Sequence, residues 1–252
     1  MDIMELSNEL ELRLNHNDPE QLLALLKVWS FKPNYSEKNS LLLFSQLNRP
    51  PISLGNKKYW ESIGYSIKPG EKPITIWIPV KNEETQEKTY ELRNRYDITQ
   101  TTGTMPYMFQ LKDAIKCMLQ YLRVTVKTDE TSPVFINDDY SHIKPLTINP
   151  SMSNEPLLDL APYVVKKMIN DPIARERYKT ASAMLIYRTT GSDTQLKGLI
   201  FSGEVSKASI VTDRAAYRAI YDNYEKWFPG LEKIPVATTK EPKAEEPSIT
   251  LD

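Results

Sequence analysis

The chain has 252 residues, of which 40% are hydrophobic and 26% are charged, and its formal net charge is −1. This is the composition of an ordinary globular protein, and the near-neutral charge excludes a chain whose whole surface is basic enough to coat DNA. Cys117 is the only cysteine, which excludes an internal disulfide framework and suits a reducing compartment.

The first predicted elements are amphipathic helices. Residues 18–29 begin with an Asp-Pro pair typical of a helix start and continue with leucines at helical spacing. Residues 36–47 form a second helix, which Ser36 caps and two following prolines stop. A short helix over residues 56–63 is ended by Gly64.

Between residues 74 and 98 the apolar period changes to two. In residues 74–80 three isoleucines take one face and leave Trp77 on the other. A polar hairpin loop over residues 81–87 leads to a strand over residues 90–98. This part of the sequence therefore predicts a small antiparallel meander with helices on one face.

The second half is predicted to be mostly helical. Helices are expected over residues 110–122, 155–170, 172–189 and 212–228, and short strands over residues 123–126, 134–136 and 146–148. The expected fold class is α+β: a small antiparallel meander packed with helices, followed by a mostly helical α+β second domain. We place the domain boundaries at 1–106 and 107–230, with a disordered tail over 231–252 that is rich in Pro, Glu, Lys and Thr.

Several short signals follow one another in order between about Tyr35 and Thr102. They are Tyr35-Ser36 with Asn39 and Gln46, Trp60 with Gly64, Lys68-x-Gly70-Glu71-Lys72, Ile76 with Pro79, and Tyr96-Asp97-Ile98-Thr99-Gln100-Thr101. This order resembles the N-terminal, single-stranded-DNA-binding domain of ArdC-type antirestriction proteins. The resemblance implies a protein of a mobile genetic element (plasmid, conjugative element or phage) that acts in DNA protection, transfer or replication.

The C-terminal half of that family resembles a zinc metallopeptidase, in which a His-Glu-x-x-His helix holds the metal. This chain has only His16 and His142, and they are far apart in sequence. Alignment on the comparable helix places Leu158 and Pro162 at the histidine positions and leaves only Asp159 near the glutamate. We therefore expect a degenerate metallopeptidase-like domain with no metal, no cofactor and no catalytic residue. His142, alone in a polar loop, is expected to be solvated.

Sequence-tolerant binding of single strands requires cations along the phosphates and aromatic faces for the bases. Both are concentrated between residues 32 and 72, where seven cations stand against three anions and Tyr35, Tyr59, Trp60 and Tyr65 lie among them. On the predicted meander, Trp77 is expected to share its face with Arg93 and Arg95, which would form a base-stacking platform. The predicted nucleic-acid-binding residues are Lys57, Lys58, Lys68, Lys72, Trp77, Arg93 and Arg95.

Structural roles are the alternative for these residues. Three tryptophans are expected in the core rather than against bases: Trp29, Trp60 and Trp227. For Trp77 the two roles stay open, and Lys57 and Lys58 could be a solvated corner. Asp97, at a strand end, is expected to bond backbone amides of the following turn rather than a ligand.

The sequence thus predicts a cytoplasmic, non-enzymatic protein whose partner is single-stranded DNA. No apolar run approaches the roughly 20 residues of a membrane span, and the acidic start lacks the basic flank of a signal peptide. The alternative is a protein-protein interaction module, built on an inactive peptidase-like domain, that recruits a host or replication partner. An enzyme is the third reading, which stoichiometric zinc in the purified protein would revive.

Overall fold

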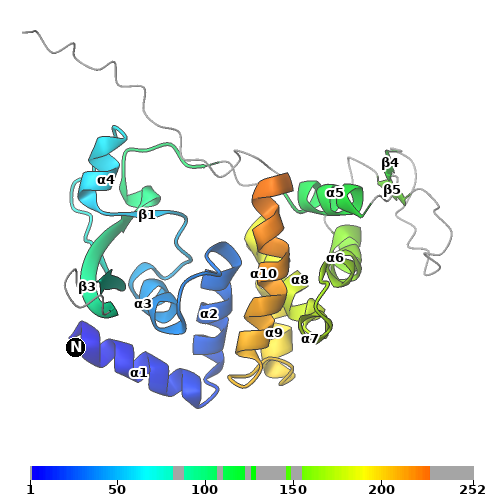
Figure 1. Cartoon of the computed structure of the whole chain (residues 1–252), viewed down its shortest axis with the longest axis horizontal. Helices are drawn as coiled ribbons and strands as arrows, with labels where there is room; N and C mark the ends of the chain where they lie inside the picture. Colours follow the sequence, from blue (N-terminus) through cyan, green and yellow to red (C-terminus); the bar gives the residue numbers. More distant parts are fainter. Residues whose placement is uncertain are drawn as a thin grey trace, which may run out of the picture.

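A computed structural model of the chain describes residues 2–81, 88–106, 110–122, 126–128, 146–148 and 155–227 (Figure 1). The helices are α1 (Ile3–Asn15), α2 (Pro19–Phe31), α3 (Glu37–Leu47), α4 (Lys57–Ser62), α5 (Leu111–Tyr121), α6 (Glu155–Met168), α7 (Pro172–Arg175), α8 (Tyr178–Thr190), α9 (Thr194–Phe201) and α10 (Ile210–Trp227), with a 3-10 turn η1 (Ile98–Gln100). The strands are β1 (Leu54–Gly55), β2 (Ile74–Lys81), β3 (Lys88–Asp97), β4 (Val126–Thr128) and β5 (Leu146–Ile148). In the part of the chain so described, no helix has the length and apolarity needed to cross a membrane.

The predicted helices α2 and α3 begin directly after the capping residues that the sequence indicates. The Asp18 carboxylate accepts the first free backbone N–H groups of α2, and the Ser36 hydroxyl accepts the N–H of Asn39 in α3. Gly64, with a φ of 83°, follows the end of α4 in the left-handed region that glycine tolerates. Helix α1 was not predicted from the sequence; it buries Leu10 and Leu14 in the main core.

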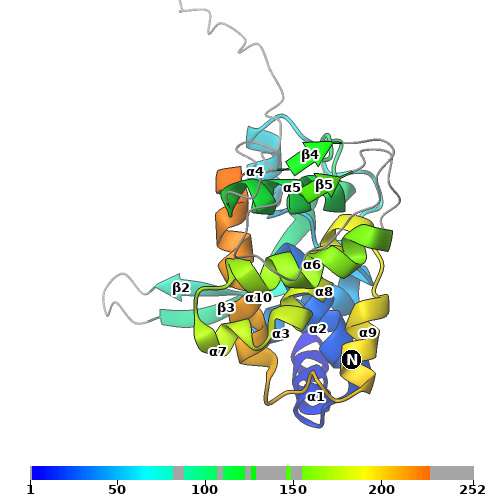
Figure 2. The ribbon, with the colours of Figure 1, turned by 90° about the vertical axis from the view of Figure 1, so that its right-hand side faces the viewer.

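The α+β class and the small antiparallel sheet are confirmed. The strand order is β1-β3-β2, so β3 is central and β1 pairs with the C-terminal end of β3 rather than with β2. The hairpin of β2 and β3 projects from the helical body (Figure 2). A separate two-stranded parallel pair, β4 and β5, lies at the opposite end of the molecule from β1 (Figure 1). Residues 146–148 form a strand as predicted.

Two amide side chains of α3 close the outer edge of β2. Asn39 donates to the carbonyl of Trp77 and accepts its N–H, both at 2.8 Å. Gln46 makes the same pair of bonds to Thr75, both at 2.9 Å. Because an open strand edge is a template for pairing with other chains, these bonds block one stretch of that edge while holding α3 against the sheet.

The predicted helix over residues 172–189 is two helices, α7 and α8. Arg177 stands at the break and reaches Asp213 of α10 at 2.6 Å and the backbone carbonyl of Glu204. Asp213 is fully buried, so the pair fixes the start of α8 against α10. Helix α9 was not predicted from the sequence.

One hydrophobic cluster includes residues from both sides of the predicted boundary at 106. It joins side chains of α1, α2 and α3 to those of α5, α6, α8, α9 and α10. Polar bonds cross the same junction: buried Arg188 donates to the carbonyl of Ser30 at 2.8 Å, as does the hydroxyl of Tyr217 at 2.7 Å, and Lys27 lies 2.5 Å from Asp193. The domain limits stay a prediction, but the two segments share a core.

Several predicted features lie outside the described residues. They are most of the hairpin loop over 81–87, residues 123–125 of the strand over 123–126, the strand over 134–136, His142, the side chain of Trp227 and the tail over 231–252.

Candidate nucleic-acid interface

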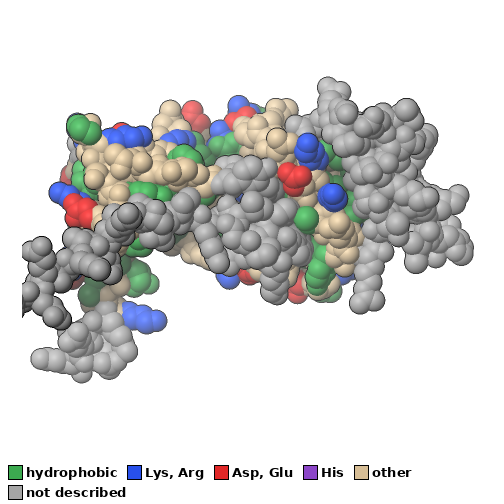
Figure 3. Space-filling view, turned by 90° about the horizontal axis from the view of Figure 1, so that it is seen from above, with side chains coloured by type: hydrophobic (Ala, Val, Ile, Leu, Met, Phe, Trp, Pro, Cys, Tyr) green, Lys and Arg blue, Asp and Glu red, His purple; other side chains and the backbone are tan. Residues whose placement is uncertain are grey.

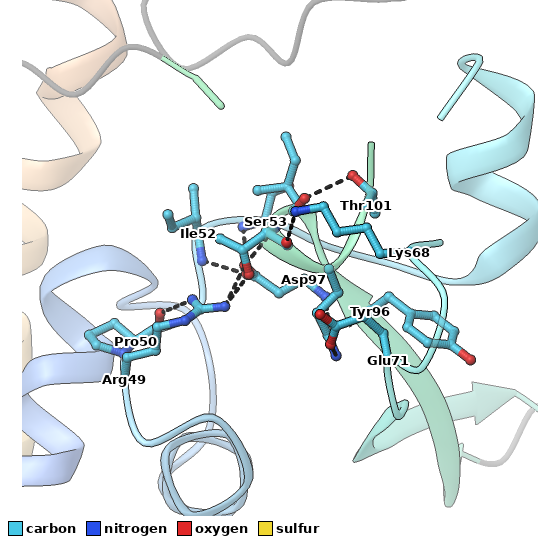
Figure 4. Close-up of polar contacts among 12 residues, drawn as sticks. Arg49, Pro50, Ile52, Ser53, Lys68, Glu71, Tyr96, Asp97 and Thr101 are labelled. Carbon is cyan, nitrogen blue, oxygen red and sulfur yellow. Dashed lines mark hydrogen bonds and ion pairs between the residues drawn. The ribbon is translucent and has the colours of Figure 1, made fainter. Parts of the chain in front are cut away.

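Asp97 ends β3, and its buried carboxylate joins three segments of the chain (Figure 4). One carboxylate oxygen accepts the backbone N–H groups of Ile52 and Ser53 at 2.7 and 3.2 Å. The other accepts a guanidinium N–H of Arg49 at 3.0 Å and, from Thr99, the N–H at 3.2 Å and the hydroxyl at 2.9 Å. The predicted bond to the following turn is therefore confirmed. Asp97 has a structural role that fixes the strand end, the loop before β1 and the 3-10 turn together.

Gln100 positions the loop that carries two of the predicted lysines. Its side-chain oxygen accepts the N–H of Asp97 at 2.8 Å, while its amide nitrogen donates to the carbonyl of Lys72 at 2.8 Å and the carboxylate of Glu71 at 3.0 Å. The backbone N–H of Lys68 donates to the carbonyl of Gln100 at 2.9 Å. Since Gln100 is buried and both lysines are exposed, the loop is held from inside and presents its cations to solvent.

The four predicted lysines are exposed on α4 and on the loop that follows it. The ammonium of Lys57 lies 3.7 Å from the carboxylate of Glu61, and the ammonium of Lys68 donates to a backbone carbonyl of η1 at 2.8 Å. Within the described residues, Lys58 and Lys72 have no ion pair. Surface pairs such as Lys57 with Glu61 contribute about 0–1 kcal/mol, so a phosphate can compete for these cations.

Trp77 combines features of both roles left open by the sequence. Its side chain is half-buried and packs against the main core, while the ammonium of Lys38 lies 5.2 Å from its ring centroid. Glu11 of α1 approaches that ammonium at 3.8 Å. The indole N–H is buried and finds no acceptor in the part of the chain described by the structure.

The predicted platform of Trp77 with Arg93 and Arg95 is wrong in its geometry. Trp77 stands directly opposite Leu92 in the register, whereas Arg93 faces Ile76 and Arg95 faces Ile74. Directly opposite residues share a face of an antiparallel sheet, so both arginines lie on the isoleucine face. Arg93 is also paired with the carboxylate of Glu91. Whether either arginine contacts nucleic acid stays a prediction, but neither lies beside the indole.

The expected core tryptophans are confirmed where they are described. Trp29 and Trp60 are fully buried, and the indole N–H of Trp60 donates to the carbonyl of Tyr96 at 3.0 Å. A Cβ at Gly55 would lie 2.8 Å from the Trp60 ring, so glycine lets β1 pass close to that indole. The sequence signal around Trp60 is therefore structural.

Two residues near Trp77 were missing from the predicted site. Tyr90 of β3 has 64% of its surface exposed, and Lys38 of α3 covers the indole. The alternation of Tyr90 and Leu92 with charged residues placed both on one face of β3, but only the register between the strands shows that this is the face of Trp77.

Seen from above, Lys and Arg side chains are scattered among hydrophobic ones and do not form one large patch (Figure 3).

The metal site implied by the family resemblance does not fit the residues of α6. Leu158 packs against the main core, Pro162 lies inside the helix, and Asp159 is exposed. Across the described ranges, no group of three or more His, Cys, Asp or Glu side chains could hold a metal ion. The two positions aligned with the histidines carry Leu158 and Pro162, whose side chains cannot ligate a metal.

No protein-family model matches the chain, and no curated protein matches it. Among solved structures it is similar to the antirestriction protein ArdC of plasmid R388. The metal-free crystal structure has a TM-score of 0.35, 12% identity, and coverage of 85% of this chain and 97% of that one. The Mn(II)-bound structure has a TM-score of 0.38, 12% identity, and coverage of 83% and 97%. These structural neighbours are of the family that the sequence signals resemble.

Proposed function

We propose that this chain is a non-enzymatic, single-stranded-DNA-binding protein of a mobile genetic element, acting in the cytoplasm in DNA protection (antirestriction), transfer or replication. The proposal starts from the ordered sequence signals that resemble ArdC-type proteins. The supporting structural observation is the loop that carries Lys68 and Lys72, here called the lysine loop, which is held in place by hydrogen bonds of Gln100. Two lysines on this loop and two on the neighbouring α4 are exposed, and a phosphate backbone passing over them would meet four cations.

The mechanism would be electrostatic capture followed by contacts to bases. Each phosphate neutralised on a single strand releases counterions and contributes a slope of about −0.7 to the dependence of log K on log salt. Four lysines at four phosphates would therefore give a slope near −2.8. No bond is made or broken in this function.

The test is fluorescence anisotropy with a labelled oligonucleotide, single-stranded and duplex, across a salt series. We expect tighter binding of the single strand, and a slope reduced by about 1.4 in Lys58→Ala/Lys72→Ala. The matched control is Lys112→Ala/Lys116→Ala, two exposed lysines on α5. Absence of single-strand binding at low salt would overturn the proposal.

A protein-protein interaction module remains the second candidate, because three large hydrophobic side chains are well exposed in the C-terminal half. They are Ile173, Phe201 and Val211. This candidate would come first if the anisotropy experiment shows no binding. Stoichiometric zinc together with peptide hydrolysis by the purified protein would instead overturn the non-enzymatic part of the proposal.

A further inference from the structure

The β2–β3 hairpin has one face that combines aromatic and apolar side chains. In the register, Trp77 stands opposite Leu92 and Pro79 stands opposite Tyr90. Opposite and alternate residues share a face, so these four side chains form one surface, here called the Trp77 face. The hairpin projects from the helical body (Figure 2).

Exposure increases along the Trp77 face toward the hairpin tip. Trp77 and Leu92 are half-buried, Pro79 is exposed, and Tyr90 is 64% exposed. The strand edge next to Trp77 is already occupied by Asn39 of α3. A ligand at this place therefore meets side chains, and cannot add as a strand at Trp77.

The charges around the Trp77 face favour an anionic ligand. Lys88 alternates with Tyr90 and so lies on the same face, and the ammonium of Lys38 stands 5.2 Å from the Trp77 ring centroid. Within β2 and β3 the two carboxylates are elsewhere: Glu91 is opposite Ile78, on the other face, and Asp97 is buried in its own bonds. Glu11 of α1 lies 3.8 Å from the ammonium of Lys38, but this ion pair is open to solvent and weak, so a phosphate can displace it. Rings between Lys38 and Lys88 therefore suit a ligand with stacked bases and a phosphate backbone.

We propose that bases of the single strand stack on Tyr90 and against the edge of Trp77, with Lys38 and Lys88 meeting the phosphates. This inference rests on the proposed function and names the base-contacting surface within it. Diagonal neighbours such as these two rings lie about 7–8 Å apart, more than the ~3.4 Å between nucleotides along each strand of a duplex, so an extended single strand fits them better than a stacked one. A strand crossing the hairpin can therefore place bases on both rings.

The experiment uses the full chain and two labelled 20-nucleotide probes, oligothymidine and an abasic strand of the same length, in an anisotropy salt series. Tyr90→Ala is expected to weaken binding of oligothymidine by about five-fold to about 150-fold, which corresponds to about 1–3 kcal/mol for one stacked base. The salt slope should not change, because no cation is lost. Tyr90→Phe should bind like the wild type, and binding of the abasic strand should be unaffected by either change.

The matched control is Phe201→Ala, which removes an exposed aromatic ring, 77% accessible, from α9. Thermal unfolding of each variant shows whether it is folded. If the wild type binds oligothymidine and Tyr90→Ala binds it equally well, the stacking surface is refuted while the proposed function stands. An equal loss on both probes refutes stacking as well. If the wild type binds neither probe at low salt, the proposed function itself fails.

Discussion

Replacing Asp97 by Asn tests whether the fold of the lysine-bearing segment depends on one buried carboxylate. In the wild type one carboxylate oxygen accepts two backbone N–H groups, those of Ile52 and Ser53, and the other accepts donors of Arg49 and Thr99. In Asp97→Asn, one of these oxygens becomes an NH2 group that can accept nothing. At least two donors in the Asp97 site then lose their acceptor.

The expected cost follows from those donors. Each buried donor left without an acceptor costs about 1–3 kcal/mol, so the free energy of unfolding should fall by about 2–6 kcal/mol. The side chain of Arg49 is 35% exposed, so water compensates for much of its lost partner and little is added for the ion pair.

Urea unfolding followed by circular dichroism measures the loss, and amide hydrogen exchange at Ile52 and Ser53 locates it. The control is Glu61→Gln, which removes only the exposed pair with Lys57 and should change the free energy of unfolding by less than about 0.5 kcal/mol. A loss below about 1 kcal/mol in Asp97→Asn, with exchange at both amides unchanged, would refute the reasoning.

Three further changes test other parts of the structure. Asn39→Ala removes both bonds to the backbone of Trp77 and should speed exchange of that amide, with a loss of about 1–3 kcal/mol in urea unfolding; unchanged exchange would contradict the edge role. Burial raises the pKa of Asp18, but its bonds from Arg13 and the α2 backbone outweigh this and leave the pKa below its ordinary value. A lowered pKa in the folded state stabilises the protein at neutral pH, and this stabilisation is lost as the pH falls through the folded-state pKa. Asp18→Asn should therefore be less stable than the wild type at pH 7, and the difference should shrink steadily as the pH is lowered below about 4, measured by urea titration at each pH. A fragment ending at Pro106 lacks the helices that complete the shared core and should show no cooperative thermal unfolding; a sharp transition would support autonomous domains.

Local signals in the sequence were enough to place most helices. Asp18 and Ser36 mark the starts of α2 and α3 because their capping bonds involve residues two or three positions away. The break between α7 and α8 was not visible, because Arg177 binds Asp213 across 36 positions of sequence. Propensity alone continues a helix through such a point, and only the tertiary bond shows why it ends.

The face of Trp77 could be predicted in part. Alternation within each strand correctly separated Trp77 from the isoleucines, but it does not fix which residue of β3 stands opposite. An offset of one residue moves every side chain of the partner strand to the other face. The register pairs Trp77 with Leu92, and this alone moved Arg93 away from the indole and brought Tyr90 near it.

The sequence signals that resemble ArdC-type proteins are, in this structure, mainly the residues that hold the segment together. Asn39 closes the edge of β2, Asp97 ties the end of β3 to the loop before β1 and to the 3-10 turn, and Gln100 fixes the lysine loop. Residues with such roles would be needed for the fold whether or not the protein binds DNA. The resemblance therefore supports the fold of this segment more directly than it supports DNA binding. Binding must come from exposed side chains that no internal bond explains, above all Lys58 and Tyr90. For this reason variants at those two positions test the function, whereas variants at Asp97 test only the fold.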